Sequence, residues 1–354
     1  MSDSPSPQPA TTTTNSQRPP LRLSCVVPAY NEAANLEAFL PALHQVVSGL
    51  AAECEIVLIN DGSQDETHET ALRLAQQLPL QYVQLSRNFG KEAALSAGLD
   101  YARGNAVLLI DADFQHPLPL VTEMVQLWHS GYDVVYGVIT DRSDERASKR
   151  WGTRLFYYLM NRNSRFQIPK NAGDFRLMDR KVVDVLRQLP ERNRFMKGLY
   201  AWAGFKSVAL PFVPDARRSG QSSFNLHRLA SLAFEGLTSF TTIPLRVWSL
   251  AGFCISLAAI LYGIYITIET LIFDNPTDGW PTLAAGLMLF SGVQLMSIGM
   301  LGEYIGRIYE EVKRRPLYVV DQHVATHALS DTRPATAAAE TPAPAPSNSD
   351  SPKT

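Results

Sequence analysis

The sequence lacks the features that mark several common classes of enzyme and binding protein. Its three cysteines, Cys25, Cys54 and Cys254, lie far apart without metal-ligand spacing, so we expect reduced core residues. The seven histidines form no HExxH pair. No GxGxxG follows the first strand-like run and no GxxxxGKS or GxxxxGKT occurs, which excludes a dinucleotide fold and a P-loop. A net charge of −2 and a pI near 6.4 argue against a general nucleic-acid binder.

The two ends of the chain also lack the apolar residues that a folded core needs. Residues 1–20 are rich in Pro, Ser, Thr and Gln, and residues 325–354 in Ala, Pro, Thr and Ser, so both are predicted to be disordered tails. No basic stretch followed by an apolar one appears near Met1, so no secretory signal is predicted. We therefore expect the globular part to stay in the cytoplasm.

From Leu23 to Gly137, short β-rich runs alternate with helical stretches, whereas residues 141–230 are less regular. Such alternation is typical of an α/β fold with a mostly parallel sheet that helices cover on both faces. In such a sheet the ligand binds beyond the carboxyl ends of the strands. Strands are expected at Leu23–Pro28, Glu55–Asn60, Gln81–Leu85, Ala106–Ile110 and Asp133–Tyr136, and helices at Ala33–Gly49, Asp65–Gln77, Lys91–Ala102 and Leu118–Ser130.

Polar residues directly follow three of these strand candidates, at Tyr30–Glu32, Asp61–Ser63 and Asp111–Asp113. Residues i and i+2 of an extended segment point the same way, so Asp111 and Asp113 can face one hard cation. Aspartate oxygens suit Mg²⁺ or Mn²⁺, and Mg²⁺ takes substrate phosphates as further ligands. An Asp-x-Asp pair alone is also typical of a strand end followed by an acidic turn. The prediction of a metal site therefore depends on whether the rest of the chain binds a nucleotide whose phosphates can complete it.

Two long segments without charged residues, Val247–Ile268 and Gly279–Gly302, predict membrane-spanning helices. Each provides the roughly 20 residues that cross about 30 Å of hydrocarbon. The short loop between them holds Asp274 and Asp278 but no Lys or Arg. Basic residues flank the other ends, so the positive-inside rule places both termini and the large domain in the cytoplasm. These flanking residues are Arg246, Arg307, Lys313, Arg314 and Arg315.

Two further segments suit a membrane surface. Asp144–Asn163 mixes basic and aromatic residues, which suits a membrane surface or a phosphate ligand and equally suits a helix with one solvated face. Phe224–Thr242 has apolar residues at near-helical spacing and leads into the first expected span. Gly302 and Gly306 form a GxxxG motif, which indicates helix pairing and hence a homo-oligomer.

Four motifs occur in a fixed order and together resemble the inverting family 2 glycosyltransferases. Two later motifs and the expected spans narrow the resemblance to bacterial polyprenyl-phosphate (bactoprenol) glycosyltransferases, relatives of dolichol-phosphate mannose synthase. The resemblance covers residues 22–320. The motifs are Val26–Glu32 (VVPAYNE), Asn60–Ser63 (NDGS), Arg87–Lys91 (RNFGK), Asp111–Pro117 (DADFQHP), Gly173–Met178 (GDFRLM) and Asn193–Phe195 (NRF).

The resemblance implies a nucleotide-diphospho-sugar (GT-A type) fold and assigns roles to its strand-end residues. Tyrosine can pack on a base, and carboxylates accept hydrogen bonds from base or ribose donors. A metal, Mg²⁺ or Mn²⁺, would bridge the diphosphate and absorb charge as the nucleotide leaves. Nucleotide-sugar binding falls to Pro28, Tyr30, Glu32, Asp61, Lys91, Asp111 and Ala112, and the metal environment to Asp111, Asp113 and Gln115.

A lipid monophosphate acceptor has a second pKa near ~6, so it is largely ionised at neutral pH and needs no strong general base. Cations would position it beside the diphosphate. The resemblance places Arg142, Arg150, Arg217 and Ser222 at the acceptor phosphate, and Arg142, Asp113 and Asp174 at the reaction. Asp174 would orient the sugar or the acceptor. Two departures weaken the acceptor assignments: Ile139 stands where relatives often have Arg, and Ser223 where the family has Lys.

The predicted function is inverting transfer of one hexose from an NDP-sugar, with UDP-glucose favoured, to undecaprenyl or another polyprenyl phosphate at the cytoplasmic face of the bacterial inner membrane. A processive polysaccharide synthase is an alternative, but Ala147 stands where its Gln-x-x-Arg-Trp motif needs Gln. A second alternative is a non-catalytic, membrane-anchored nucleotide-sugar sensor. A turnover assay beside a binding measurement separates a sensor from the enzyme, because a sensor would bind the nucleotide sugar without converting it. The sequence leaves the sugar, the polyprenol length and the glycan open.

The predicted division of the chain follows from these assignments. A catalytic domain is expected at residues 21–223, an interfacial helix at 224–243, two membrane helices within 244–306 and a cytoplasmic juxtamembrane segment at 307–324.

Overall fold

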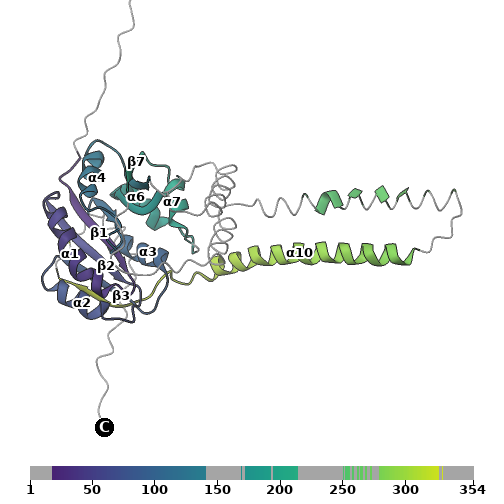
Figure 1. Cartoon of the computed structure of the whole chain (residues 1–354), viewed down its shortest axis with the longest axis horizontal. Coiled ribbons are helices and arrows are strands. Elements are labelled where there is room, and N and C mark those ends of the chain that lie inside the picture. Colours follow the sequence, from purple (N-terminus) through teal and green to yellow (C-terminus); the bar gives the residue numbers. More distant parts are fainter. Residues whose placement is uncertain are drawn as a thin grey trace, which may run out of the picture.

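The computed structural model describes residues 18–140, 172–192, 194–213 and 279–326, with Pro169, Leu329 and scattered positions between 250 and 272. Within these residues, an α/β domain is followed by a long helix that projects away from it (Figure 1). The predicted segments Asp144–Asn163 and Phe224–Thr242 lie outside this description, and Val247–Ile268 is described only in part.

The described residues form one eight-stranded sheet with the order β7-β5-β6-β4-β1-β2-β3-β8. Its centre is parallel: β4 (Ala106–Leu109), β1 (Arg22–Ala29), β2 (Glu53–Asn60) and β3 (Leu80–Leu85) run in one direction. Nearly every side chain of these strands is buried, as expected for strands covered on both faces. The α/β fold and its first four strands are therefore confirmed, as is the fifth, β5 (Val134–Ile139).

Helices cover both faces of this sheet and create two apolar cores. The core on one face receives α1 (Ala33–Ser48), α2 (Thr67–Ala75) and α4 (Leu120–His129). The core on the other face receives α3 (Lys91–Tyr101), α6 (Arg180–Gln188) and α7 (Met196–Trp202). The four predicted helices are confirmed within about two residues at each end.

Three strands add to the sheet where the sequence predicted none. β6 (Ala172–Asp179) inserts antiparallel between β4 and β5, and β7 (Ser207–Phe212) pairs with β5 as an edge strand. β8 (Val320–Ala325) pairs antiparallel with β3 at the other edge. The ordered domain thus reaches into the expected juxtamembrane segment, and Arg18, in the expected tail, already pairs with Asp133 and Asp179.

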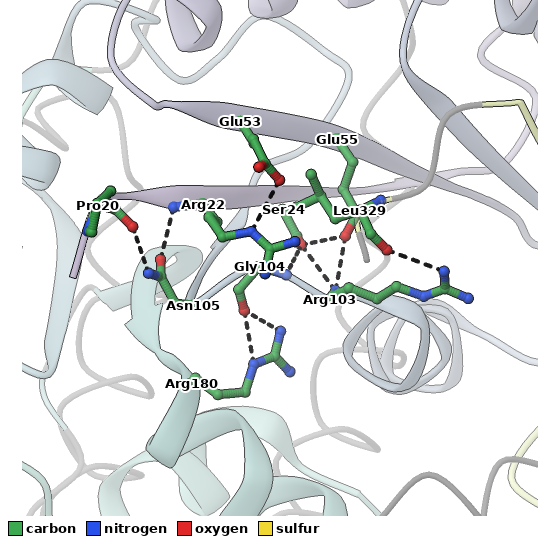
Figure 2. A network of polar contacts seen from close by, with 10 residues as sticks. All are labelled: Pro20, Arg22, Ser24, Glu53, Glu55, Arg103, Gly104, Asn105, Arg180 and Leu329. Carbon is green, nitrogen blue, oxygen red and sulfur yellow. Dashed lines mark hydrogen bonds and ion pairs between the residues drawn. The ribbon is translucent and has the colours of Figure 1, made fainter. Parts of the chain in front are cut away.

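A polar network lies at the amino ends of β1 and β2, opposite the carboxyl ends where the site is described below (Figure 2). Glu55 is fully buried, and its Oε1 accepts hydrogen bonds from Ser24 Oγ at 2.5 Å and from the Arg103 N–H at 2.8 Å. The Leu329 N–H donates to its Oε2 at 3.1 Å. Because a buried carboxylate is costly without such partners, this network ties the α3–β4 turn and a residue near the C-terminus to the sheet.

The C-terminal end of the long helix α10 (Trp280–Lys313) adjoins the domain, and the rest of the helix projects away from it (Figure 1). Near that end, Glu311 Oε1 accepts a hydrogen bond from the Arg192 N–H at 2.8 Å. No helix within the described part of the chain combines the length and the apolarity that crossing a membrane requires.

Candidate active site

The loops that follow β1 and β2 lie side by side because the two strands are parallel neighbours. Asn31, in the left-handed region at φ 57°, accepts a hydrogen bond from the Gln64 N–H at 2.8 Å. Its own N–H donates to Ser63 Oγ at 2.9 Å. The Glu32 N–H donates to Thr67 Oγ1 at 3.0 Å. Two of the three polar strand ends predicted from the sequence therefore form one interlocked surface.

The predicted nucleoside-binding residues of β1 lie at this surface. Pro28 is half-buried within the strand, and Tyr30 is 43 % exposed directly after it. The Tyr30 ring is therefore accessible for packing on a base. Glu32 accepts a hydrogen bond from Asn35 Nδ2 at 2.6 Å, which orients its carboxylate.

Asp61 connects this surface to the loop that follows β3. It is buried, and its two carboxylate oxygens accept hydrogen bonds from the Phe89 N–H at 2.7 Å and the Gly90 N–H at 2.9 Å. Burial raises the pKa of Asp61, although these two hydrogen bonds act against the rise. In the structure Asp61 thus holds in place the loop that leads to Lys91.

The centre of the site is an ion-paired triplet formed by Lys91, Asp111 and Asp174. The antiparallel register of β6 on β4 pairs Leu109 with Arg176, so the residues just beyond bring Asp174 next to Asp111. Lys91, the first residue of α3, lies between them: its Nζ is 2.7 Å from Asp111 Oδ2 and 3.5 Å from Asp174 Oδ2. The consecutive elements α3 and β4 and the distant strand β6 thereby place one cation between two carboxylates.

The charges of this triplet stabilise each other. Burial acts to lower the pKa of Lys91, but Asp111 and Asp174 outweigh it and hold that pKa above its ordinary value. Burial acts to raise the pKa of Asp111, but Lys91 and His116 hold that pKa well below its ordinary value. Lys91 is therefore a permanent cation and Asp111 a permanent anion at neutral pH.

The predicted metal residues follow β4 in a turn. The strand ends at Leu109, one residue earlier than predicted, and Phe114 adopts φ 60°. Strand alternation therefore does not set the directions of Asp111 and Asp113, contrary to the prediction from their spacing. Asp113 Oδ1 accepts a hydrogen bond from the Gln115 N–H at 3.1 Å, and Ala112 is buried.

Within the described residues, no three His, Cys, Asp or Glu side chains are grouped as a complete metal cage. Asp111 and Asp113 nevertheless fit a cation of the kind that Mg²⁺ sites accept, with one or two carboxylates and the remaining ligands from substrate phosphates. These two carboxylates therefore supply part of a coordination shell, and a substrate would have to supply the rest.

Several residues at this site received no role from the sequence. His116 Nε2 lies 3.7 Å from Asp111 Oδ2, and its ring stacks on Phe175 at 4.6 Å between centroids. Burial and the nearby Asp174 raise the pKa of Glu92 to about 7, while its carboxylate accepts a hydrogen bond from the Met196 N–H at 3.2 Å. Their positions in the sequence could have indicated that they belong to the site, because Glu92 follows Lys91 directly and His116 lies within the Asp111–Pro117 motif.

The predicted acceptor-phosphate residues are not described by the structure. Arg142, Arg150, Arg217 and Ser222, together with Ser223, fall outside the described residues. Ile139 is described and is the last residue of β5.

The sequence is similar to known families and proteins. The sequence model described as "Glycosyl transferase family 2" matches residues 24–187, and that described as "GtrB C-terminal hairpin" matches residues 243–308. An uncharacterised glycosyltransferase of Synechocystis sp. is 45% identical over 301 residues, covering 85% of this chain and 95% of that protein. The bactoprenol glucosyl transferase of Shigella phage SfII is 44% identical, covering 85% and 97%. A prophage bactoprenol glucosyl transferase homolog of Escherichia coli K12 is 41% identical, covering 85% and 98%.

Proposed function

Because the chain belongs to glycosyl transferase family 2, we propose that this enzyme transfers glucose from an NDP-sugar to a polyprenyl phosphate, with inversion at the anomeric carbon. One structural observation carries the proposal: Lys91 lies between Asp111 and Asp174, where the nucleotide-binding loops converge. The sugar and the acceptor are those named in relatives that are 41–44% identical across 85% of the chain.

The donor would bind across the interlocked loops after β1 and β2, and UDP-glucose is the favoured donor. Tyr30 offers an exposed ring to the base, and Glu32 offers a carboxylate to base or ribose donors. Asp61 orders the loop of Lys91. The Lys91 ammonium would then attract the diphosphate to the carboxyl end of β4, because cations bind phosphate through charge-assisted hydrogen bonds.

A divalent cation, Mg²⁺ or Mn²⁺, would be held by Asp111 and Asp113 with Gln115 beside them. When bound, such an ion supplies charge stabilisation to the departing diphosphate. The pairing of Asp111 with Lys91 keeps this carboxylate ionised and ready to bind a cation.

The remaining residues position the reacting groups and do not remove a proton, because the phosphate acceptor is already largely ionised at neutral pH. Asp174 Oδ2 contacts Lys91, whereas its buried Oδ1 has no hydrogen-bond partner among the described residues. That oxygen can accept a hydrogen bond from a sugar hydroxyl and fix the orientation of the ring. Arg142, Arg150, Arg217 and Ser222 are proposed contacts of the acceptor phosphate.

We further propose that the hairpin matched at residues 243–308 contacts the lipid bilayer, with Val247–Ile268 and Gly279–Gly302 as its two spans. Large apolar side chains of α10 support this, because Leu283, Leu287 and Leu295 are each more than 65 % exposed. Uncovered apolar surface of this kind marks a membrane or protein contact. Under this proposal the protein is integral to the bacterial inner membrane, with the α/β domain and both termini in the cytoplasm.

The test uses membranes that contain the full chain, a polyprenyl phosphate and labelled UDP-glucose, UDP-galactose, UDP-N-acetylglucosamine or GDP-mannose. We expect label from UDP-glucose in a lipid from which mild acid releases the labelled sugar, because the bond between the anomeric carbon and the phosphate is acid-labile. Absence of labelled lipid with all four donors would refute the proposed function. Transfer from another donor would retain the reaction and change the sugar.

A further inference from the structure

A cavity opens between α7 and the β5, β6 and β7 end of the sheet, and one of its lining residues, Arg176, is two residues from Asp174. Its volume is about 140 Å³. Since one water needs only about 10–15 Å³ on this measure, the cavity has room for a phosphate-sized group. The residues that matter here are Tyr136, Arg176, Lys197, Tyr200 and Ser207.

Arg176 places a buried cation at this cavity. The residue is 4 % exposed, and its Nη2 donates to the Gly173 carbonyl at 2.7 Å. Its guanidinium lies 3.4 Å from the centroid of the Tyr200 ring. Its Nε has no hydrogen-bond partner among the described residues, and no described carboxylate forms an ion pair with it. Asp174 and Glu92 act on it only electrostatically. A buried guanidinium that has no carboxylate in ion-pair contact among the described residues is costly, so this geometry favours an anion as ligand.

Two side chains of α7 add to this cationic lining. Tyr200 is 8 % exposed, and its hydroxyl has no partner among the described residues. Lys197 precedes it by three residues and therefore lies on the same face of the helix. None of the described residues that line the cavity is acidic. The cavity thus combines two cations and a hydroxyl donor.

We propose that this cavity binds the phosphate monoester of the acceptor, with Arg176 and Lys197 as its cations and Tyr200 as a hydrogen-bond donor. A monoester carries −1.5 to −2 charges at pH 7, which two cations match. Asp174 and Arg176 are two residues apart in β6. The phosphate would therefore bind near the sugar-orienting carboxylate. This inference rests on the proposed function and adds three described residues to the arginines expected from the sequence.

The test measures the affinity of the purified full chain for farnesyl phosphate, with farnesol and inorganic phosphate as comparison ligands. Lys197→Gln and Tyr200→Phe should each weaken farnesyl phosphate binding by about tenfold, the effect of losing one charge-assisted contact. UDP-glucose affinity and the melting temperature should change little. Lys206→Gln is the matched control, because Lys206 is an exposed lysine of the same region that does not line the cavity. Arg176→Lys is a further variant, but its burial makes the other two the decisive ones.

The outcomes separate this inference from the proposed function. Active wild-type enzyme whose Lys197→Gln and Tyr200→Phe variants bind farnesyl phosphate normally would overturn the inference and leave the transfer reaction intact. Inorganic phosphate binding that these variants abolish, without any effect on farnesyl phosphate, would also overturn it, because the cavity would then hold a free ion. Weaker farnesyl phosphate binding beside unchanged farnesol binding supports it, whichever sugar is transferred.

Discussion

At the scale of single residues, the site depends on how charges compensate one another. The single positive charge of Lys91 lies between Asp111 and Asp174 and offsets part of the repulsion between the two carboxylates. Asp113 lies two residues further along, and its Oδ1 accepts a hydrogen bond from the Gln115 N–H. The two aspartates of the motif therefore have different surroundings, and substitutions should separate their roles.

Asp113→Ala should abolish metal-dependent turnover while the protein stays folded. The side chain lies in a turn after β4 and outside both apolar cores, so its loss removes a proposed metal ligand and little packing. Turnover is measured with and without added Mg²⁺ or Mn²⁺, and folding by thermal denaturation. Full activity in this variant, or full wild-type activity in EDTA, would contradict the metal assignment.

Glu92→Gln should stabilise the protein more at pH 8 than at pH 5. The pKa of Glu92 is raised from 4.5 to about 7 by burial and by Asp174, so ionisation in the folded state is disfavoured. Its contribution to stability is present below pH 4.5 and is lost as the pH rises through 7, by up to about 1.4 kcal/mol per pKa unit. The glutamine keeps an oxygen for the Met196 N–H.

Thermal denaturation of both proteins at the two pH values checks this. Glu123→Gln, on the exposed side of α4, provides the baseline for removing one surface charge. A difference between Glu92→Gln and the parent that is the same at both pH values would show that the carboxyl titrates normally.

At the scale of secondary-structure elements, the interlocked loops require a glycine at one position. Gly62 has φ +64°, and a Cβ there would lie 2.4 Å from the backbone carbon of Arg87. Gly131 has φ +93° but open space around it. The two positions share the strain of a left-handed conformation, about 1–2 kcal/mol for an L-residue, and differ in the clash.

Gly62→Ala should therefore destabilise the protein clearly more than Gly131→Ala and should also weaken donor binding. Its clash pushes the loop of Arg87 and Lys91 away from the strand ends. Chemical denaturation gives the two free energies of unfolding, and UDP-glucose titration gives the affinities. Equal effects of the two substitutions would show that the contact between the β2 and β3 loops is not tight.

The elements also show what the sequence could and could not predict. β1, β2 and β4 were found because strands buried on both faces contain long apolar runs, and β3 because its short β-rich run lies between two helical stretches. β8 was missed because its sequence, Val-Asp-Gln-His-Val-Ala, has no such run and lies at an edge. β6 carries Asp174, Arg176 and Asp179, so its charges concealed a central strand. β7 contains Pro211, which an edge strand tolerates.

Some residues around the site could not be found from the sequence for a related reason. The motifs located Asp111, Asp113 and Asp174. The cavity residues Lys197 and Tyr200 belong to α7, a seven-residue helix that is too short to show a helical pattern of apolar residues. Arg176 was visible in the Gly173–Met178 motif, yet only the register of β6 on β4 shows that it is buried beside the site.

At the scale of the whole molecule, the chain should fractionate with membranes and require detergent for extraction. Replacing Leu287 and Leu295 of α10 with lysine should reduce this, because each charge is costly at the centre of a bilayer, by about 2.5–3.5 kcal/mol on insertion scales. The measurement is the amount of protein in washed membranes. Release of the parent protein by high salt or carbonate alone would contradict the two proposed spans.

The length of α10 has a consequence for the distance between the site and the lipid. Its 34 residues measure about 50 Å at 1.5 Å per residue, whereas the hydrocarbon core needs only about 30 Å. The charged end of the helix is fastened to the domain by Glu311 and, through the short return to β8, by the sheet itself. If the uncharged part is immersed, the last eleven residues, Glu303–Lys313, hold the site about 16 Å above the lipid. Under the proposed membrane contact, the acceptor would then lift its first isoprene units out of the bilayer, so the reach of the lipid chain as well as the charge of its phosphate would limit binding.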